Sequence, residues 1–535
     1  MAIARLRTTD VLPLVRNAAP FIRANSSSDA SAKALYFSVE NEQPEPLQTT
    51  IKGEVPAWIN GSLLRNGPGK YEVGNDTYNH VFDGLSLLTR FNISEGKVTY
   101  QSRFQRSDSY TKAMEQNRIV VSEFGTMAHP DPCLSIFGRF MSMFKQGEMT
   151  DNCNVNWMAF GDECYVMTET SSIRKIDPVG LETLDKVDLS KKVAVHTATA
   201  HPHIGNDGTL YNMGSHFAKK THYNIIKAPP PDPGVMADPM SKASILCSIP
   251  ASDKFPSYYH SFGMTDNYIV FLEQPLVLNI LKLRFARLFR NESFLDAMQY
   301  HETRPARFHL VKRDTGELLS QKFLTDALFC FHHINAYEEA GHVVVDLCCY
   351  RDIGIMNGLN FAEQGKGLTD VDAVGKRFIL PLEHEKTPGV NLNGLDYSKA
   401  TSVLKEDGSI HCTPELLSEQ YLELPRINYE KHNGKPYKYF YALSGTLDKL
   451  VKVDTTTGTS QVWMEGGSFP SEPIFINAPG STSEDDGVVV SAVINTREGK
   501  PSFLVVLDAR DMKELARAEI DAEVTLGIHG MYLAN

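Results

Sequence analysis

Short apolar runs separated by turn residues recur along this chain from about Ala34 to its end. Runs rich in β-branched and aromatic residues and bounded by Gly, Asn, Asp or Pro are typical of β-strands. Sustained helical periodicity is scarce by comparison. The pattern therefore predicts an all-β fold, and its clearest strands are expected at Glu163 to Thr168, Tyr268 to Leu272, Val343 to Cys349, Gly487 to Ile494 and Phe503 to Leu507.

The length of 535 residues would by itself suggest several domains. No long Pro- or Gly-rich linker divides the strand-rich region, however, so a single closed β architecture is favoured. A β-propeller accounts for the number of strands, the size and the protection of strand edges together. Its internal repeat is not visible at a fixed period, so the strand pattern permits a propeller without requiring one.

Charge and cysteine usage exclude some classes of protein. Lys and Arg total 53 against 65 for Asp and Glu, a net charge of −12, so no global positive field exists to attract nucleic acid. The 8 cysteines show no paired CxxC spacing, and Cys348 and Cys349 are adjacent in an apolar run. We interpret them as reduced thiols of an intracellular protein. No apolar run reaches the roughly 18 residues of a membrane-spanning helix, and no obligate protein partner is expected.

Residues 1–33 differ in composition from the rest of the chain. They are rich in Arg and Ser and poor in acids, as mitochondrial transit peptides are. Pro13 and Pro20 would interrupt an amphipathic helix, and a disordered tail is the alternative. We expect a tail over 1–33 and one domain over 34–535, with a mitochondrial location or, alternatively, a cytosolic one at membrane surfaces.

Two segments interrupt the strand pattern, Cys133 to Lys145 and Leu276 to Arg290. Both interleave large apolar side chains with Lys and Arg, which is how an interfacial helix lies among lipid headgroups. A helix packed on the core is the alternative for each one. Together, in an acidic chain, they indicate a patch that contacts a membrane surface.

A lone imidazole, His260, lies in the stretch PSYYHSFGMTDNYIVFLEQP from Pro256 to Pro275. Gly263 to Asn267 are expected to form a turn into the apolar strand that begins at Tyr268. A histidine here either bonds a backbone carbonyl in the core or binds a metal, because neutral imidazole is the commonest protein ligand of transition metals.

Three further histidines, His201, His332 and His529, lie in similar surroundings. The spacings are 260 − 201 = 59, 332 − 260 = 72 and 529 − 332 = 197, so none forms a local ligand motif. They fit a central site that receives one histidine from each of several blades. The carboxylates Glu169, Glu423 and Glu472 lie beside apolar runs, where each is either salt-bridged or exposed, or accepts the N–H of a metal-bound imidazole.

Eight stretches of the chain together resemble the animal carotenoid cleavage oxygenases, which include the β-carotene oxygenases and the retinoid isomerohydrolase of the visual cycle. The resemblance runs from about residue 36 to 535 and is highly specific. The stretches are GSLLRNGPGKYEVG, HVFDGLSLLTRF, RIVVSEFGTMAHPDPC, AHPHIGNDGTLYNMG, PSYYHSFGMTDNYIVFLEQP, FHHINAYEE, FPSEPIF and EDDGVVVSAV.

The resemblance implies a seven-bladed β-propeller with short helical insertions that form an apolar cap over an axial iron site. It implies Fe(II) held by four histidines that match His201, His260, His332 and His529, and outer glutamates that match Glu169, Glu423 and Glu472. All seven positions are intact. The implied enzyme is an iron(II)-dependent dioxygenase that cleaves a carotenoid with O2 and needs no catalytic residue beyond the metal centre.

The bond that is cut is set by finer features, and these conflict. Tyr259 before His260 resembles the cleaving members, FHHIN resembles the central-cleaving and isomerase branches, and the N-terminus resembles the mitochondrial off-centre enzymes. We expect the 9′,10′ bond ahead of the 15,15′ bond. The alternatives are an isomerohydrolase of retinyl esters and a propeller that binds carotenoid without turnover. Two further residues stand out. Cys133 lies at a position that is thought to be acylated in the isomerohydrolase branch, and a free or buried thiol is the alternative. His196 occupies a position where relatives tend to carry Asn.

Overall fold

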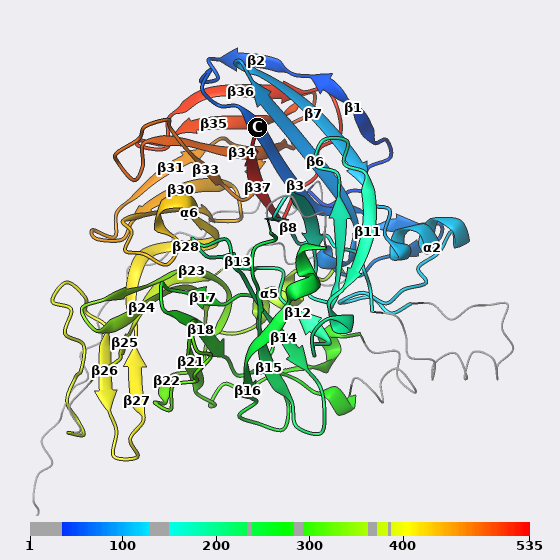
Figure 1. Ribbon diagram of the computed structural model, residues 1–535. Helices are drawn as coiled ribbons and strands as arrows, with labels where there is room; N and C mark the ends of the chain where they lie inside the picture. The colour runs from blue at the N-terminus through cyan, green and yellow to red at the C-terminus, as the bar shows by residue number, and fades with distance from the viewer. Residues whose placement is uncertain (1–34, 129–148, 233–237, 283–292, 362–371, 384–386) are drawn as a thin grey trace, which may run out of the picture.

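The computed structural model describes residues 35–128, 149–232, 238–282, 293–361, 372–383 and 387–535. The chain runs once around the molecule, and in Figure 1 the colours pass from blue through green and yellow to red, which ends beside blue. Among the described helices, none is long and apolar enough to cross a lipid bilayer.

Six sheets of four or more strands succeed one another around a common axis in the described part of the chain, and the seven-stranded sheet forms two blades, so the fold is a seven-bladed propeller. β28 (Glu415–Ile427) serves both of these blades, because its first part pairs with β25 and its second part with β29. Blades 1 to 3 contain the following strands: β8 (Asn156–Phe160), β9 (Glu163–Met167), β10 (Ser172–Ile176) and β11 (Thr183–Asp188) in blade 1; β12 (Thr197–Ala198), β13 (His203–Ile204), β14 (Leu210–His216), β15 (His222–Ala228) and β16 (Ser244–Pro250) in blade 2; β17 (Gly263–Met264), β18 (Tyr268–Glu273), β21 (Ala306–Lys312) and β22 (Phe323–Thr325), extended by β27 (Ile410–Thr413) and β26 (Thr401–Leu404), in blade 3.

Blades 4 to 7 complete the circle. Their strands are β23 (Phe329–Glu339), β24 (His342–Tyr350), β25 (Val374–Pro381) and the start of β28 in blade 4; the end of β28, β29 (Tyr439–Ser444), β30 (Lys449–Asp454) and β31 (Ser460–Met464) in blade 5; β32 (Ser468–Pro470), β33 (Ile474–Asn477), β34 (Gly487–Asn495), β35 (Ser502–Asp508), β36 (Glu514–Ile520) and β2 (Thr50–Gly53) in blade 6; β37 (His529–Ala534), β3 (Gly61–Lys70), β6 (Leu85–Ser94), β7 (Lys97–Phe104) and β1 (Gln43–Gln48) in blade 7.

The two ends of the described chain close the circle together. The last strand, β37, pairs antiparallel with β3, and the early strand β2 pairs with β36 of the preceding blade. Blades 6 and 7 are therefore both built from residues at opposite ends of the sequence, as the blue and red strands at the top of Figure 1 show. This arrangement leaves no free edge at the junction of first and last blade.

Apolar clusters fill the spaces between consecutive blades. Leu64 and Leu88 of blade 7, for example, pack with Trp157 and Val166 of blade 1, and Val505 of blade 6 packs with Tyr441 of blade 5. The other neighbouring pairs share clusters of the same kind. Because each face of a blade is buried against its neighbour, strands such as β24 are buried along their whole length, which explains their nearly continuous apolar sequence.

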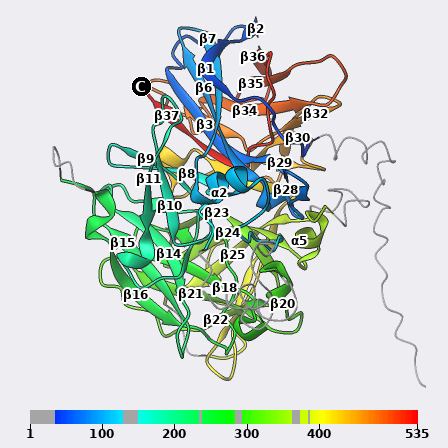
Figure 2. The same ribbon diagram turned by 90° about the vertical axis from the view of Figure 1, so that its right-hand side faces the viewer.

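Insertions between the blade strands explain why no fixed repeat is visible in the sequence. Insertions of different lengths separate the blade strands, and they include several short elements. These are β4 (Glu72–Val73), β5 (Asp76–Thr77), β19 (Leu276–Leu278), β20 (Met298–Tyr300), α2 (Asp108–Gln116), α5 (Gly354–Gly358), α6 (Tyr429–His432), η1 (Val81–Asp83), η2 (Leu189–Lys191), η3 (Pro239–Lys242) and η4 (Leu295–Ala297). Figure 2 shows α2 near the centre of the view and α5 to its lower right.

The five strands predicted most clearly from the sequence agree with β9, β18, β24, β34 and β35 to within one residue at each end. Two predictions were wrong in part. Gly263 and Met264 form strand β17, paired with β18, so the turn is confined to residues 265–267. Leu276–Leu278 forms the buried strand β19, because it pairs with β20 in the core and so cannot begin an interfacial helix. The segment 283–290, the segment Cys133 to Lys145 and the tail 1–33 lie outside the described residues.

Candidate metal centre

Each blade contributes one of the seven residues singled out in the sequence. The histidines come from blades 2, 3, 4 and 7: His201 follows β12, His260 precedes β17, His332 lies in β23, and His529 begins β37. The glutamates come from blades 1, 5 and 6: Glu169 follows β9, Glu423 lies in β28, and Glu472 precedes β33. Residues from all around the ring thus reach the axis, where the inner ends of the blades meet.

The four imidazoles converge there. One nitrogen of each lies within 4.8 Å of those of the others. The Nε2 atom of His260 is 2.8 Å from Nε2 of His201 and 3.1 Å from Nε2 of His332, and the latter is 3.2 Å from Nε2 of His529. Among the described residues this is the one cluster of metal-ligating side chains with such geometry.

Three of the four imidazoles are held by a carboxylate on their outer nitrogen. His260 Nδ1 lies 2.6 Å from Glu169, and His529 Nδ1 lies 2.8 Å from Glu472. His332 Nδ1 lies 2.5 Å from Glu423. His201 has no carboxylate partner of this kind among the described residues. The three glutamates therefore fix the ring orientation of three ligands and leave the fourth without such support.

These contacts also settle which ring nitrogen carries the proton. An ionised carboxylate can only accept, so Nδ1–H of each of the three imidazoles must donate to it. In a neutral imidazole Nε2 then carries a lone pair. Three lone pairs point at one another with no proton between them, an arrangement that repels itself unless a cation lies among them. The donor set therefore fits a metal ion of the kind that imidazole binds, such as iron or zinc.

The spacing of the nitrogens distinguishes between coordination geometries. Two nitrogens about 2.1 Å from one metal lie about 3.0 Å apart at a right angle and about 3.4 Å apart at the tetrahedral angle. The observed separations of 2.8 and 3.1 Å are nearer to the right-angle value, and that of 3.2 Å lies midway between the two. The two shorter separations favour an ion with open ligand positions over the closed tetrahedral arrangement of structural zinc.

Two arginines lie close to Glu472 and offset its negative charge. Arg65 and Arg426 lie 3.9 and 3.7 Å from its carboxylate oxygens, and Arg65 also donates to its backbone carbonyl at 3.0 Å. Burial acts to raise the pKa of Glu472, but Arg426, His529 and Arg65 outweigh it and lower the pKa to about 2. Glu472 is therefore a carboxylate at neutral pH although it is buried.

His201 and His529 are neutral at neutral pH for a different reason. Burial lowers the pKa of His201 well below its ordinary value, and the neighbouring histidines lower it further. Burial likewise lowers the pKa of His529 to about 4, although Glu472 opposes the change. Neutral imidazoles are the form that binds a metal.

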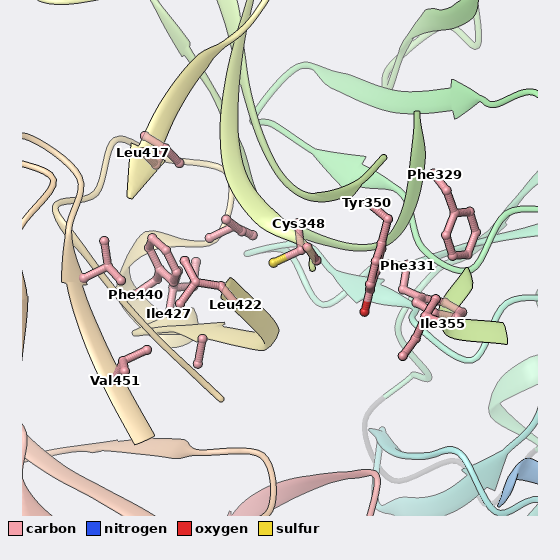
Figure 3. Close-up of a cluster of buried hydrophobic side chains, with 14 of the residues drawn as sticks. Phe329, Phe331, Cys348, Tyr350, Ile355, Leu417, Leu422, Ile427, Phe440 and Val451 are labelled. Atoms are coloured by element: carbon pink, nitrogen blue, oxygen red, sulfur yellow. The ribbon is translucent and has the colours of Figure 1, made fainter. Parts of the chain in front are cut away.

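A large apolar cavity of about 280 Å³ opens onto His260, His332 and His529. Its wall combines aromatic and aliphatic side chains of the blades with residues of the cap, including Val81 of η1, Leu278 of β19 and Ile355 of α5. Figure 3 shows Phe331, Tyr350 and Ile355 lying together at one end of the buried cluster that supports this wall. A cavity of this composition suits a large apolar ligand.

Several residues that touch the site were not recognised from the sequence. The hydroxyl of Tyr258, rather than that of Tyr259, donates to Glu169 at 2.9 Å, while Tyr259 bonds Ser215. Arg65 could have been recognised from the sequence. It lies inside the run that forms the buried strand β3, and a buried arginine needs an anionic partner. His196 is exposed and stacks on His216, outside the cluster. Cys133 lies outside the described residues.

Comparisons with known proteins bear on this site. Residues 36–534 match the model of a family described as retinal pigment epithelial membrane protein. A β,β-carotene 15,15′-dioxygenase of Rattus norvegicus is 44% identical over 514 residues, 92% of this chain and 90% of that protein. A mitochondrial carotenoid-cleaving dioxygenase of Homo sapiens is 40% identical over 563 residues, 98% of this chain and 96% of that protein.

Solved structures of a Synechocystis apocarotenoid oxygenase share the fold. One variant superposes with a TM-score of 0.77 at 23% sequence identity and covers 96% of this chain and 100% of that one. A cobalt-substituted form of the same oxygenase superposes with a TM-score of 0.76, also at 23% identity, over 95% of this chain and 99% of that one.

Proposed function

Because the chain belongs to the family of the retinal pigment epithelial membrane protein and the carotenoid oxygenases, we propose that it is an iron(II)-dependent dioxygenase that cleaves a double bond of a carotenoid. The observation that carries the proposal is the cluster of four converging imidazoles, three of which line an apolar cavity of about 280 Å³. A metal centre and a site for a long apolar substrate thus meet in one place.

His201, His260, His332 and His529 would hold the iron. When bound, iron(II) supplies the activation of dioxygen that an alkene does not undergo unaided. Glu169, Glu423 and Glu472 accept hydrogen bonds from Nδ1–H of three of these imidazoles. The Nε2 lone pairs of the same three rings then point towards the centre. None of the four first ligands is anionic, so these carboxylates also supply the negative charge that a dication needs nearby.

The cavity positions the substrate. A polyene offers no group for hydrogen bonding, so its register must be set by the shape of the aromatic and aliphatic wall. Side chains such as Phe331 and Tyr350 exclude water from the region beside the histidines. The reaction breaks one C=C bond, and each atom of O2 becomes the oxygen of one of the two carbonyl products.

The bond that is cut is the finer part of the proposal. We favour the 9′,10′ bond over the 15,15′ bond because the Arg- and Ser-rich N-terminus is of the mitochondrial type. The alignment with the mitochondrial carotenoid-cleaving dioxygenase also covers 98% of this chain. The same features lead us to propose that residues 1–33 direct the protein to mitochondria. Fusion of these residues to a fluorescent protein tests this, and a diffuse cytosolic signal would contradict it.

Substrate delivery from a membrane surface is a further part of the proposal. Carotenoids dissolve in lipid, and Met149 at the wall of the cavity has 40% of its surface exposed. An apolar rim of this kind allows a substrate to pass from lipid to the cavity without crossing water. Binding to phospholipid vesicles, measured by flotation, is the expected result, and a protein that stays entirely in the aqueous fraction would argue against it.

Product analysis tests the activity and names the bond. Purified, iron-loaded protein is incubated with β-carotene in detergent under air and under nitrogen. The proposal predicts apo-10′-carotenal with ionone, formed in air alone, while retinal in air would move the cut to the 15,15′ bond. Cleavage of retinyl esters under nitrogen would identify an isomerohydrolase instead. No product from β-carotene, xanthophylls or retinyl esters would indicate a protein that binds without turnover.

A further inference from the structure

A second chamber, smaller and polar, meets the histidine cluster on the His201 side. Its volume is about 100 Å³, and its wall includes His203, His333, Arg426, Tyr429 and Asn433. His201 lines this chamber but not the apolar cavity, whereas His260 lines the apolar cavity but not this chamber. His332 and His529 line both. The metal centre therefore stands between an apolar space and a polar one.

His201 is the least restrained of the four ligands. It is partly exposed, whereas the other three are buried. It has no carboxylate on its outer nitrogen among the described residues, whereas each of the others has one. A ligand without such support rotates away from a metal more readily than one that is held. His201 would therefore be the first of the four imidazoles to release a bound ion, and it is the one that lines the smaller chamber alone.

The wall of the chamber includes residues at α6 that are partly exposed. Tyr429, the first residue of that helix, lines the chamber and has 39% of its surface exposed. Its hydroxyl lies 2.8 Å from Nδ1 of His203, whose Nε2 lies 2.9 Å from the carbonyl of Phe262. Asn433, directly after the helix, also lines the chamber. These side chains form its outer wall.

Inside the chamber one side-chain nitrogen has no hydrogen-bond partner among the described residues. Nε2 of His333 is buried and makes no hydrogen bond to the described residues. Ser261 Oγ donates to the carbonyl of Phe331 at 2.6 Å, so its single proton is used, and Nδ1–H of His333 must donate to Ser261 at 2.9 Å. Nε2 of His333 then carries a lone pair. Such an atom can bind a water molecule or a passing cation.

Arg426 is paired with Glu472, but its charge still reaches the chamber, since burial and, to a smaller extent, Arg426 lower the pKa values of His201 and His203. Its Nη1 lies 3.7 Å from Glu472, and its Nη2 donates to the carbonyl of Gly530 at 3.3 Å. On this path a hydrated dication meets imidazoles, an amide and a phenol, besides Arg426 and apolar side chains such as Phe262. The wall of the apolar cavity carries Glu123, Glu169 and Glu423 but is mostly aromatic and aliphatic, so the same ion would lose more of its hydration there.

We propose that the polar chamber is the port through which the metal ion enters and leaves, and that His201 is the ligand that opens to admit it. This inference rests on the proposed metal centre. It assigns separate routes to the hydrophilic ion and the apolar substrate, so that a bound carotenoid does not block exchange of the metal.

The test is the rate of iron release. Iron(II)-loaded protein is mixed, without oxygen, with an excess of a coloured iron(II) chelator, at two chelator concentrations to establish that release from the protein limits the rate. Asn433→Trp narrows the outer end of the chamber and is expected to slow release about tenfold, a barrier higher by about 1.4 kcal/mol. Tyr429→Ala widens it and is expected to speed release.

The matched control is Met149→Trp, which adds the same side chain at the wall of the apolar cavity. It should release iron at the wild-type rate. Slower release by Met149→Trp, or wild-type rates in both Asn433→Trp and Tyr429→Ala, would overturn the port. If Asn433→Trp does not fold, as judged by circular dichroism, Tyr429→Ala decides by itself. A wild-type protein that retains no iron would overturn the metal centre as well as the port.

Discussion

At the scale of the residue, the direction of three protons determines what the centre can do. Glu169, Glu423 and Glu472 accept hydrogen bonds from Nδ1–H of three imidazoles, so the lone pairs on Nε2 face the axis. Removing one imidazole removes a ligand, whereas changing one glutamate alters only how a ligand is held. The two kinds of substitution should therefore differ in their effects.

Replacing His260 by Ala is expected to abolish iron retention and turnover while the protein stays folded. His260 lies nearest to two other ligand nitrogens, and its loss opens the centre to the apolar cavity. Metal analysis and circular dichroism of the purified variant check this. His196→Ala is the matched control, because His196 is exposed and outside the cluster; it should keep its iron. An iron-replete, active His260→Ala variant would refute the assignment of the site.

The glutamates should differ among themselves. Glu169→Gln keeps an oxygen that accepts from Nδ1–H of His260, so a loss of iron affinity of about tenfold is expected. Glu472→Gln also leaves the buried Arg65 and Arg426 without their carboxylate. We expect it to lower the free energy of unfolding by about 3 kcal/mol as well. Iron titrations and urea unfolding measure both effects. Equal, negligible effects at all three glutamates would contradict the role given to them.

At the scale of the element, the pairing of β37 with β3 places His529. Gly530 lies opposite Arg65 in this pairing. A Cβ at Gly530 would collide with the carbonyl oxygen of Leu64 and lie 2.8 Å from Cγ of Arg65. The two strands must then separate.

Gly530→Ala is therefore expected to destabilise the protein by about 2–4 kcal/mol and to weaken iron binding, because His529 moves with the strand. Thermal unfolding and metal analysis test this. Gly466→Ala is the control, since no atom lies within 4 Å of its added Cβ. If Gly530→Ala unfolds and binds iron like Gly466→Ala, β37 does not control the position of His529.

A buried carboxylate fixes the start of α2 against blade 1. Asp151 accepts from the backbone N–H of Asp108 and of Ser109, each at 3.0 Å, and pairs with Arg174. Burial acts to raise the pKa of Asp151, but these hydrogen bonds and Arg174 lower it to about 2. A lowered pKa stabilises the folded state above the ordinary pKa of Asp, and the stabilisation is lost as the pH falls towards 2.

Asp151→Asn should therefore reduce the free energy of unfolding at pH 7 by about 2 kcal/mol. The difference from wild type should shrink by roughly half at pH 3. Urea unfolding at pH 7, 5 and 3 measures it. A difference that stays constant over this range would show that the ionised form of Asp151 contributes nothing.

The elements also show what a single sequence can reveal. Long apolar strands such as β24 and β34 could be located to within a residue, because both faces of an inner strand are buried and the predicted runs are apolar except for Asp346 and Ser491. Short strands could not. β17 contains only Gly263 and Met264, and its strand character comes from pairing with β18 rather than from its own composition. β19 was obscured in the same way by the basic residues that follow it.

At the scale of the whole molecule, the ring brings distant residues together. Composition and spacing left each histidine open to a structural interpretation, since 197 residues separate His332 from His529. The family resemblance selected the seven positions, and the propeller explains why they meet: every blade gives one residue to the axis. Partners such as Tyr258 and Arg65 depend on the packing of blades against one another and left no periodic signal in the sequence.

One measurement tests the central claim most directly. Iron-free protein is titrated anaerobically with iron(II), and carotenoid cleavage is then measured after oxygen is admitted. The account predicts that activity rises linearly and saturates at one iron per chain, with none before iron is added and none without oxygen. Cleavage by the iron-free protein, or cleavage that proceeds without oxygen, would contradict it.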